Sequence, residues 1–208
     1  MRRLSQWRRA GGAALMMAAL AGCSGVNSKY PLSSPKAAVP DHSLEGMWKT
    51  GQDKDGASYV YVVYGDHGVG RIAPFGKGST YPSSGYVFFV TRTPSHTYLN
   101  LTGANVGSAE NQPSIDTIAR RAVGETDAFT FMEYHYNWLG RLICADPDEQ
   151  VVGAAVQKGE LKGTVDLDDK KNVAAVHLTD SPAHILNYFE TTKGAFSKGT
   201  AWTKLGGP

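Results

Sequence analysis

The chain has 208 residues, of which 41% are hydrophobic, 10% aromatic and 19% charged, and its formal net charge is +2. This composition is that of a globular protein and excludes a disordered chain. The 24 glycines and 10 prolines favour many short strands over a few long helices, and the two cysteines exclude both a disulfide-rich scaffold and a four-cysteine zinc site.

The first 22 residues have the pattern of a secretory signal. Four arginines and no acid precede an uncharged apolar run from Ala10 to Leu20. This run is shorter than the roughly 20 residues of a stable membrane anchor. Removing the signal takes away four of the 21 basic residues, so 17 remain against 19 acidic ones. The mature chain is therefore slightly acidic, which disfavours a nucleic-acid partner.

The signal ends in Leu20-Ala21-Gly22-Cys23, which resembles the lipobox of bacterial lipoproteins. The resemblance implies that the sulfur of Cys23 is diacylated, that the signal is removed before it, and that the new amino terminus is acylated. Each buried methylene contributes about 0.8 kcal/mol, so two or more chains give stable anchoring. Ser24 stands where an Asp would imply retention in the inner membrane, so the resemblance implies the outer membrane.

The signal pattern and the lipobox resemblance divide the chain into three predicted segments. Residues 1–22 are the signal peptide, residues 23–40 are a flexible tether that carries the lipidated Cys23, and residues 41–208 are one folded domain. The tether prediction depends on three prolines and several serines, because such a segment has little apolar surface to bury.

Strand signals follow one another along the domain, with turn residues between them. Hairpins are predicted from the β-branched and aromatic runs, and a closing strand comes at the end (57–64 with 69–73, 85–92 with 96–102, 129–138 with 141–145, 161–167 with 173–178, and 200–205). Consecutive antiparallel hairpins favour an all-β fold, an antiparallel β-barrel that leaves no free edge.

Two short helices are predicted late in the chain. One begins at Asp146-Pro147-Asp148-Glu149 and ends near Gly159, and the other begins at Asp180-Ser181-Pro182 and ends near Gly194. Their apolar faces indicate accessory helices that pack against the sheet. Residues 103–126 give no clear pattern, apart from a short helix predicted over 114–121.

Gly46-Met47-Trp48 resembles the Gly-x-Trp signature of lipocalins and the wider calycin group. The resemblance implies an eight-stranded barrel with Trp48 closing one end. Two features depart from that family, because the helix over 147–158 is an insertion and no later Thr-Asp-x-x-Tyr motif is present. The alternative for Trp48 is an ordinary core aromatic residue.

Sequence motifs for catalysis are absent. Gly70 to Gly78 has the wrong spacing for a phosphate-binding loop, Asp53 to Gly56 is better interpreted as a hairpin turn than as a calcium loop, and no Gly-x-Ser-x-Gly is present. None of the six histidines has metal-ligand spacing. We expect Cys144 to be a buried small hydrophobe. The sequence therefore predicts neither an enzyme nor a cofactor.

The most suggestive stretch is Glu133-Tyr134-His135-Tyr136. In a strand, Glu133 and His135 share one face and Tyr134 and Tyr136 share the other. If the first face lines the barrel, Glu133 and His135 orient a ligand near its mouth, and if the aromatic face lies inside, they face water. These four residues and Trp48 are the candidate ligand-binding residues.

Three functions are consistent with these patterns. The first is a membrane-anchored envelope lipoprotein that binds a small hydrophobic ligand in a cavity of several hundred Å³. The second is a non-enzymatic lipoprotein with a structural or protein-interaction role, which would expose an apolar patch. The third, a hydrolase or lyase using Glu133 and His135, depends only on their shared face. The sequence does not distinguish the periplasmic side from the cell surface.

Overall fold

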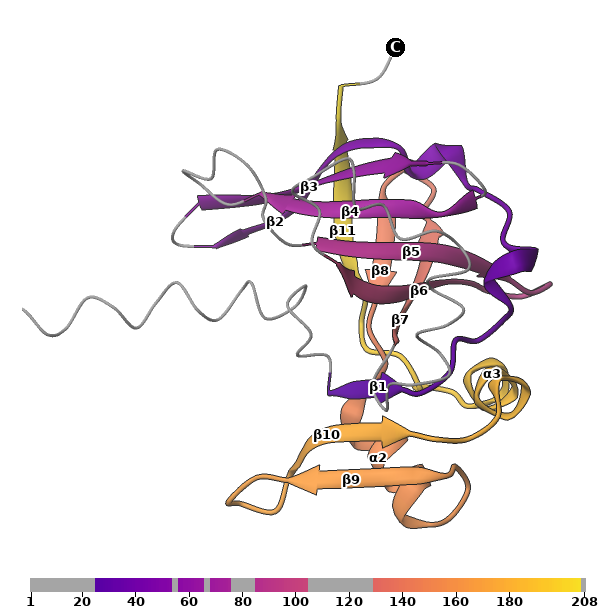
Figure 1. Cartoon of the computed structure of the whole chain (residues 1–208). Coiled ribbons are helices and arrows are strands. Elements are labelled where there is room, and N and C mark those ends of the chain that lie inside the picture. The colour runs from indigo at the N-terminus through magenta and orange to yellow at the C-terminus, as the bar shows by residue number, and fades with distance from the viewer. Residues whose placement is uncertain (1–24, 54–55, 66–67, 76–84, 105–128, 207–208) are drawn as a thin grey trace, which may run out of the picture.

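The computed structural model describes residues 25–53, 56–65, 68–75, 85–104 and 129–206 (Figure 1). Cys23, the predicted signal peptide and the helix predicted over 114–121 lie outside these ranges. The fold is an eight-stranded closed barrel with a smaller layer packed against one side of it.

The barrel consists of eight strands, and every neighbouring pair is antiparallel. Its last strand lies between the eighth and second strands of the chain and closes the ring. The predicted fold class, an antiparallel lipocalin-like β-barrel with two short accessory helices, is therefore confirmed. The barrel strands are β2 (Gly46–Asp53), β3 (Gly56–Tyr64), β4 (Gly70–Phe75), β5 (Gly85–Arg92), β6 (Thr97–Ala104), β7 (Thr130–Tyr136), β8 (Leu142–Ala145) and β11 (Thr200–Leu205).

The hairpin predicted over 161–167 and 173–178 forms, but it lies outside the barrel. Its strands β9 (Gly163–Leu167) and β10 (Val173–Leu178) make a separate three-stranded sheet with β1 (Val26–Ser28). Strand β1 pairs with β10 in parallel, whereas β9 and β10 are antiparallel. Together with helices α2 (Glu149–Gln157) and α3 (Pro182–Thr191), this sheet forms the accessory layer below the barrel in Figure 1.

Both predicted helices are present, and their side-chain caps fix where they begin. The N-cap of α2 is Asp148, whose carboxylate accepts from the backbone N–H groups of Gln150 and Val151, so the cap predicted at Asp146 is wrong by two residues. The N-cap of α3 is Ser181, with Pro182 at the first helical position. Proline is favoured there because its fixed φ suits the first turn and its missing N–H would be unpaired anyway.

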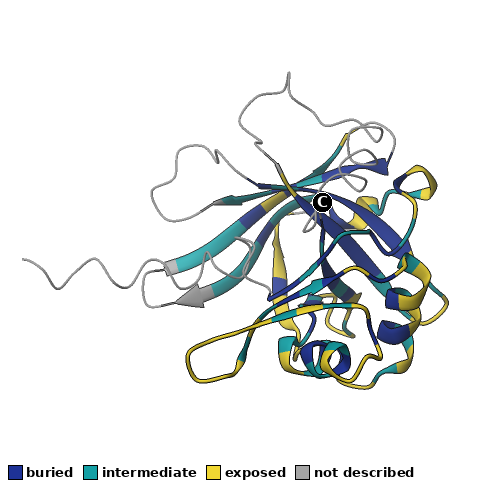
Figure 2. Cartoon of the chain, turned by 60° about the horizontal axis from the view of Figure 1, so that its bottom comes forward, coloured by how far each residue is buried: buried dark blue, intermediate teal, exposed yellow. Residues whose placement is uncertain are grey.

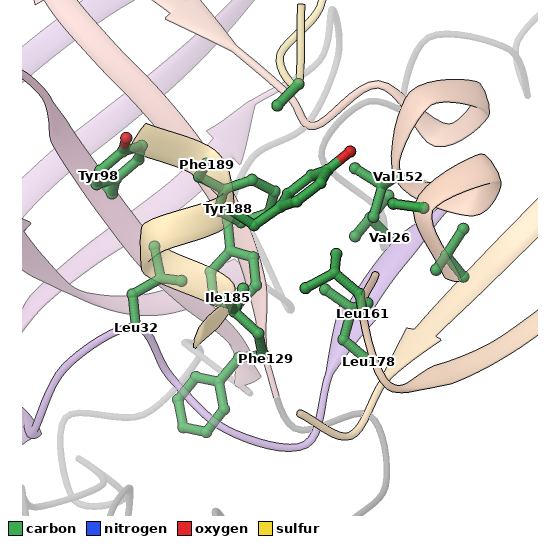
Figure 3. Close-up of a cluster of buried hydrophobic side chains, with 14 of the residues drawn as sticks. Val26, Leu32, Tyr98, Phe129, Val152, Leu161, Leu178, Ile185, Tyr188 and Phe189 are labelled. Atoms are coloured by element: carbon green, nitrogen blue, oxygen red, sulfur yellow. The ribbon is translucent and has the colours of Figure 1, made fainter. Parts of the chain in front are cut away.

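Two hydrophobic cores share the barrel wall. The inner core fills the barrel with inward side chains, including Trp48, Phe88 and Trp202. The outer core lies between the outward faces of β5 to β7 and the accessory layer. In Figure 3 the α3 side chains Ile185, Tyr188 and Phe189 lie between Tyr98 of the barrel and the side chains of β1, β10 and α2. Strand β5 is consequently buried on both faces.

The flexible tether predicted over residues 23–40 is wrong for its described part, residues 25–40. Val26 and Leu32 belong to the outer core, and the backbone N–H of Leu32 donates to the buried Asn100 Oδ1 at 2.7 Å. Prolines and serines here fix a path along the barrel wall, with a 3₁₀ turn η1 over Pro35–Ala37, instead of keeping the segment free. We call residues 25–40 the N-terminal strap.

Candidate functional site: a polar pocket at the closed end of the barrel

A 3₁₀ turn and a tryptophan close one end of the barrel. The turn η2 (His42–Leu44) directs Leu44 into the inner core, and the indole N–H of Trp48 donates to the Leu44 carbonyl at 2.7 Å. Trp48 is 1% exposed. Gly46 has φ +119°, a conformation that side chains disfavour. The Gly-x-Trp pattern thus has a physical basis here, because the glycine makes the bend and the indole fills the end.

A pocket of about 500 Å³ lies beside this closed end. It opens at the end of β7, where residues 134–136 extend past Tyr98, the first residue of β6 that pairs with β7. Asp41, which precedes η2, and the turn between β5 and β6 complete its wall. Its lining is mostly polar and comes from segments far apart in the sequence (Asp41, Arg92, Ser95, His96, Thr97, Glu133, Tyr134, His135 and Tyr136). A volume of this size suits a small ligand.

Asp41 is the centre of the hydrogen-bond network on one side of the pocket. Its carboxylate accepts from the Tyr134 hydroxyl at 2.7 Å and from the Ser43 hydroxyl at 2.5 Å, and it pairs with the Arg92 guanidinium at 2.8 Å. Burial raises the pKa of Asp41, but these hydrogen bonds and the positive charge outweigh burial and leave the pKa below its ordinary value. Asp41 therefore stays ionised and orients Arg92 and Tyr134.

The tyrosine hydroxyls of this wall stay protonated. Burial and the bond to the Asp41 carboxylate raise the pKa of Tyr134, and burial raises the pKa of Tyr136. The hydroxyl of Tyr136 lies 3.0 Å from Ser43 Oγ and is partly exposed. Tyr134 donates its one hydroxyl hydrogen to Asp41, and Tyr136 donates to Ser43 because the Ser43 hydrogen also goes to Asp41. A ligand in the pocket consequently meets hydroxyl oxygens that can accept and a guanidinium that is about half exposed.

A histidine–glutamate pair forms the opposite wall. His96 Nδ1 lies 2.5 Å from Glu133 Oε1, and the His96 ring stacks on Tyr98 with 6.0 Å between centroids. The Tyr98 hydroxyl in turn donates to Glu190 of α3 at 2.7 Å. The accessory layer therefore supports this wall, because α3 fixes the ring against which His96 stacks.

The structure brings four of the five candidate ligand-binding residues to this pocket. The aromatic face of β7 lies inside, with Tyr134 in the inner core, and Glu133 and His135 lie on the outer side of the strand. The alternative in which Glu133 and His135 line the barrel is therefore wrong. Side chains from both faces of β7 line the same pocket because the pocket lies at the rim of the barrel. Trp48 belongs to the inner core, with its ring centroid 6.5 Å from that of Tyr136.

Asp41, Arg92 and His96 were not among the residues that the sequence predicted for a site. Asp41 stands at the predicted boundary between tether and domain, and Arg92 and His96 stand at the ends of two predicted strands. A polar residue at a strand end is common, so no local pattern marks these positions. The hairpin prediction alone places Arg92 and His96 close together across one turn.

Two possible nucleophiles near this pocket, Ser43 and Cys144, are hydrogen-bonded or buried. The Ser43 hydroxyl donates to Asp41 rather than to a histidine. Cys144, as expected, is buried inside the barrel, and burial raises the pKa of its thiol. Among the residues that the structure describes, no three His, Cys, Asp or Glu side chains gather closely enough to hold a metal ion.

The opposite end of the barrel differs in its inward positions. Ser58, Gly103 and Thr200 follow the inward alternation of their strands and are small, and Gly103 and Thr200 are exposed. Large inward side chains therefore gather toward the end closed by Trp48, while these three positions at the other end carry small residues beside the larger Tyr86.

No protein-family model, curated protein or solved structure matches this chain. Among the helices described, none has the length and apolar character needed to cross a bilayer.

Proposed function

We propose that the protein is a lipid-anchored protein of the bacterial outer membrane, attached through Cys23, whose barrel binds a small molecule without transforming it. The signal-like first 22 residues and the lipobox resemblance support the anchor. The observation that carries the binding role is the pocket of about 500 Å³, in which polar groups from several distant segments converge.

The lining of this pocket favours a small polar ligand. Arg92 supplies a cation that Asp41 partly offsets, and Tyr134 and Tyr136 supply hydroxyl groups. A ligand with one anionic or strongly accepting group and further hydroxyl or amide groups fits this set, because every group can then find a partner.

Native mass spectrometry of the detergent-extracted protein tests both parts of the proposal. We expect acyl chains on Cys23 and a bound small molecule that is lost in the double variant Tyr136→Phe with His135→Ala. The matched control is Tyr61→Phe, because Tyr61 is a barrel tyrosine outside the pocket with 42% exposure against 40% for Tyr136. Equal retention of the molecule in the double variant and the control would exclude this pocket as the binding site.

A hydrophobic ligand in the barrel itself is the second candidate, and the small inward residues opposite the closed end favour it. Gly103→Trp adds a large ring at that end, where a Cβ at Gly103 meets no atom of the described residues within 4 Å. We expect this variant to lose binding of a fluorescent fatty-acid probe if the ligand enters there. Unchanged probe binding would exclude entry at this end.

The structural or protein-interaction alternative has its own supporting observation. Trp138 is 90% exposed and Leu139 is 53% exposed in the turn between β7 and β8. Crosslinking in intact cells from Trp138→Cys, with Leu205→Cys as an exposed control on β11, tests whether a partner protein covers this turn. A partner crosslinked only from position 138 would support this alternative.

A further inference from the structure

The fixed position of residue 25 bears on how an anchored protein meets its membrane. The Gly25 N–H donates to Glu149 Oε1 at 2.9 Å, and its carbonyl accepts from the backbone N–H of Val176. The next residue, Val26, is fully buried in the outer core. The chain is therefore held against the accessory layer from Gly25 onward.

Very little chain separates this fixed point from the predicted lipid. Cys23 precedes Gly25 by two residues. An extended chain spans at most about 3.6 Å per residue, so the two Cα atoms are no more than about 7 Å apart. The polar headgroup region of one leaflet is about 5–8 Å thick. Acyl chains on Cys23 would thus hold Gly25 at the headgroup boundary, whereas a free tether would let the domain drift.

The parallel pairing of β1 with β10 determines which part of the molecule lies beside Gly25. Val26 pairs with Val176, so Gly25, which directly precedes β1, lies beside the beginning of β10. The turn between β9 and β10, residues 168–172, lies beyond that beginning. Figure 1 shows this turn on the side where β1 begins, and in Figure 2 the same hairpin extends outward with exposed residues along it.

The β9–β10 turn has the chemistry of a headgroup contact. Asp168 accepts from the backbone N–H groups of Lys170 and Asn172, both at 2.8 Å, which fixes the turn. Leu167 beside it is 50% exposed. Asp168 and Asp169 balance the charges of Lys170 and Lys171. Two acidic and two basic side chains in one turn suit zwitterionic headgroups, and an exposed leucine adds apolar contact.

We infer that the β9–β10 turn, with Leu167, contacts the lipid headgroups, so that the accessory layer faces the membrane and the barrel stands above it. This inference rests on the proposed lipidation of Cys23. It assigns the face and the partner, which is a bilayer surface.

Fluorescence quenching on vesicles tests the inference. The full-length lipidated protein with Lys170→Cys is labelled with a fluorophore and reconstituted into phosphatidylethanolamine–phosphatidylglycerol vesicles that contain headgroup spin-labelled lipid. Cys23 is acylated and Cys144 is buried, so the new thiol takes the label. Leu139→Cys is the matched control, since it also lies in an exposed hairpin turn but at the closed end of the barrel.

We expect the label at position 170 to lose most of its fluorescence and the label at position 139 to keep it. Inserting ten Gly and Ser residues between Ser24 and Gly25 should abolish the quenching at position 170 while the protein still floats with the vesicles. An unquenched label at position 170 on a protein that floats overturns the membrane-facing layer. A protein that neither floats nor carries acyl mass at Cys23 overturns the proposed anchor instead.

Discussion

The inner and outer cores share the barrel wall but assemble from different kinds of chain segment. The inner core takes its side chains from the inward faces of consecutive strands and from Leu44. The outer core joins the outward faces of β5 to β7 to the N-terminal strap, the separate sheet and both helices. The alternation of side chains along a strand predicts the first arrangement, whereas the second depends on contacts between segments far apart in the sequence.

Replacing the residue that closes the barrel is expected to have the largest effect. Trp48→Ala removes a fully buried ring and leaves a cavity in the inner core, which should lower the free energy of unfolding by about 4 kcal/mol. Urea denaturation measures the change. Trp138→Ala is the matched control and should stay within about 0.5 kcal/mol, since Trp138 is exposed. An equal loss in both variants would contradict the role given to Trp48.

Ile185→Ala tests the outer core in the same way. It should lower the free energy of unfolding by about 3 kcal/mol, because Ile185 is fully buried on α3. The exposed Asn187→Ala on the same helix is the control. We expect barrel and accessory layer to unfold together, because β5 is buried by both cores. Separate transitions by intrinsic fluorescence and circular dichroism would show instead that the two cores are independent.

The attachment of the N-terminal strap depends on a buried amide. Asn100 accepts from the Leu32 N–H at 2.7 Å and donates to Thr91 Oγ1 at 2.8 Å. Asn100→Ala leaves buried polar groups unpaired and should lower the free energy of unfolding by about 2 kcal/mol. Limited proteolysis should cut residues 25–40 faster in this variant than in Asn172→Ala, which changes an asparagine of the exposed β9–β10 turn. Cleavage at the same rate would contradict the role of Asn100.

The smallest change in the free energy of unfolding is expected at Asp146, between β8 and α2. Burial, with the charge of Glu149, raises the pKa of Asp146 to about 6. Because the folded pKa exceeds the unfolded value of 3.8, the ionised carboxylate destabilises the fold at neutral pH, and this penalty disappears as the pH falls below about 4. Asp146→Asn should therefore stabilise the protein by about 1–2 kcal/mol at pH 7.

The measurement that checks the Asp146 prediction is the difference between variant and wild type in thermal unfolding from pH 4 to pH 7. That difference should grow with pH. The exposed Asp169→Asn in the β9–β10 turn serves as the control. A difference that is the same at pH 4 and pH 7 would contradict the raised pKa.

Local sequence patterns predicted most of the barrel. The alternation in β3 and β5 to β8, the turns at Gly140 and at residues 93–95, and the capping residue Ser181 all specify their structures within a few neighbouring residues. The resemblance carried by Gly-x-Trp implied that Trp48 closes a barrel end, and the structure has Trp48 in the inner core, two residues after Gly46 with its φ of +119°.

The strap and the pocket could not be predicted, because their residues act through distant partners. A segment rich in Pro and Ser has few apolar residues, but Val26 and Leu32 are enough to join a core that other elements supply. Asp41 gains its role only when barrel closure brings Arg92 and Tyr134 to it. The aromatic face of β7 is inside because β1 and α3 cover its other face, which the alternation alone does not specify.

The parallel pairing of β1 has a consequence for the order of events during synthesis. Residues 26–28 emerge first but gain their partner strand only when residues 173–178 have emerged, and the ring closes only when β11 reaches β2. Until then Gly25 and Val26 lack their backbone partners on β10, although Glu149 and Phe129 have already emerged, and contacts of such high sequence separation form slowly. The accessory sheet is therefore completed only after most of the chain has been made.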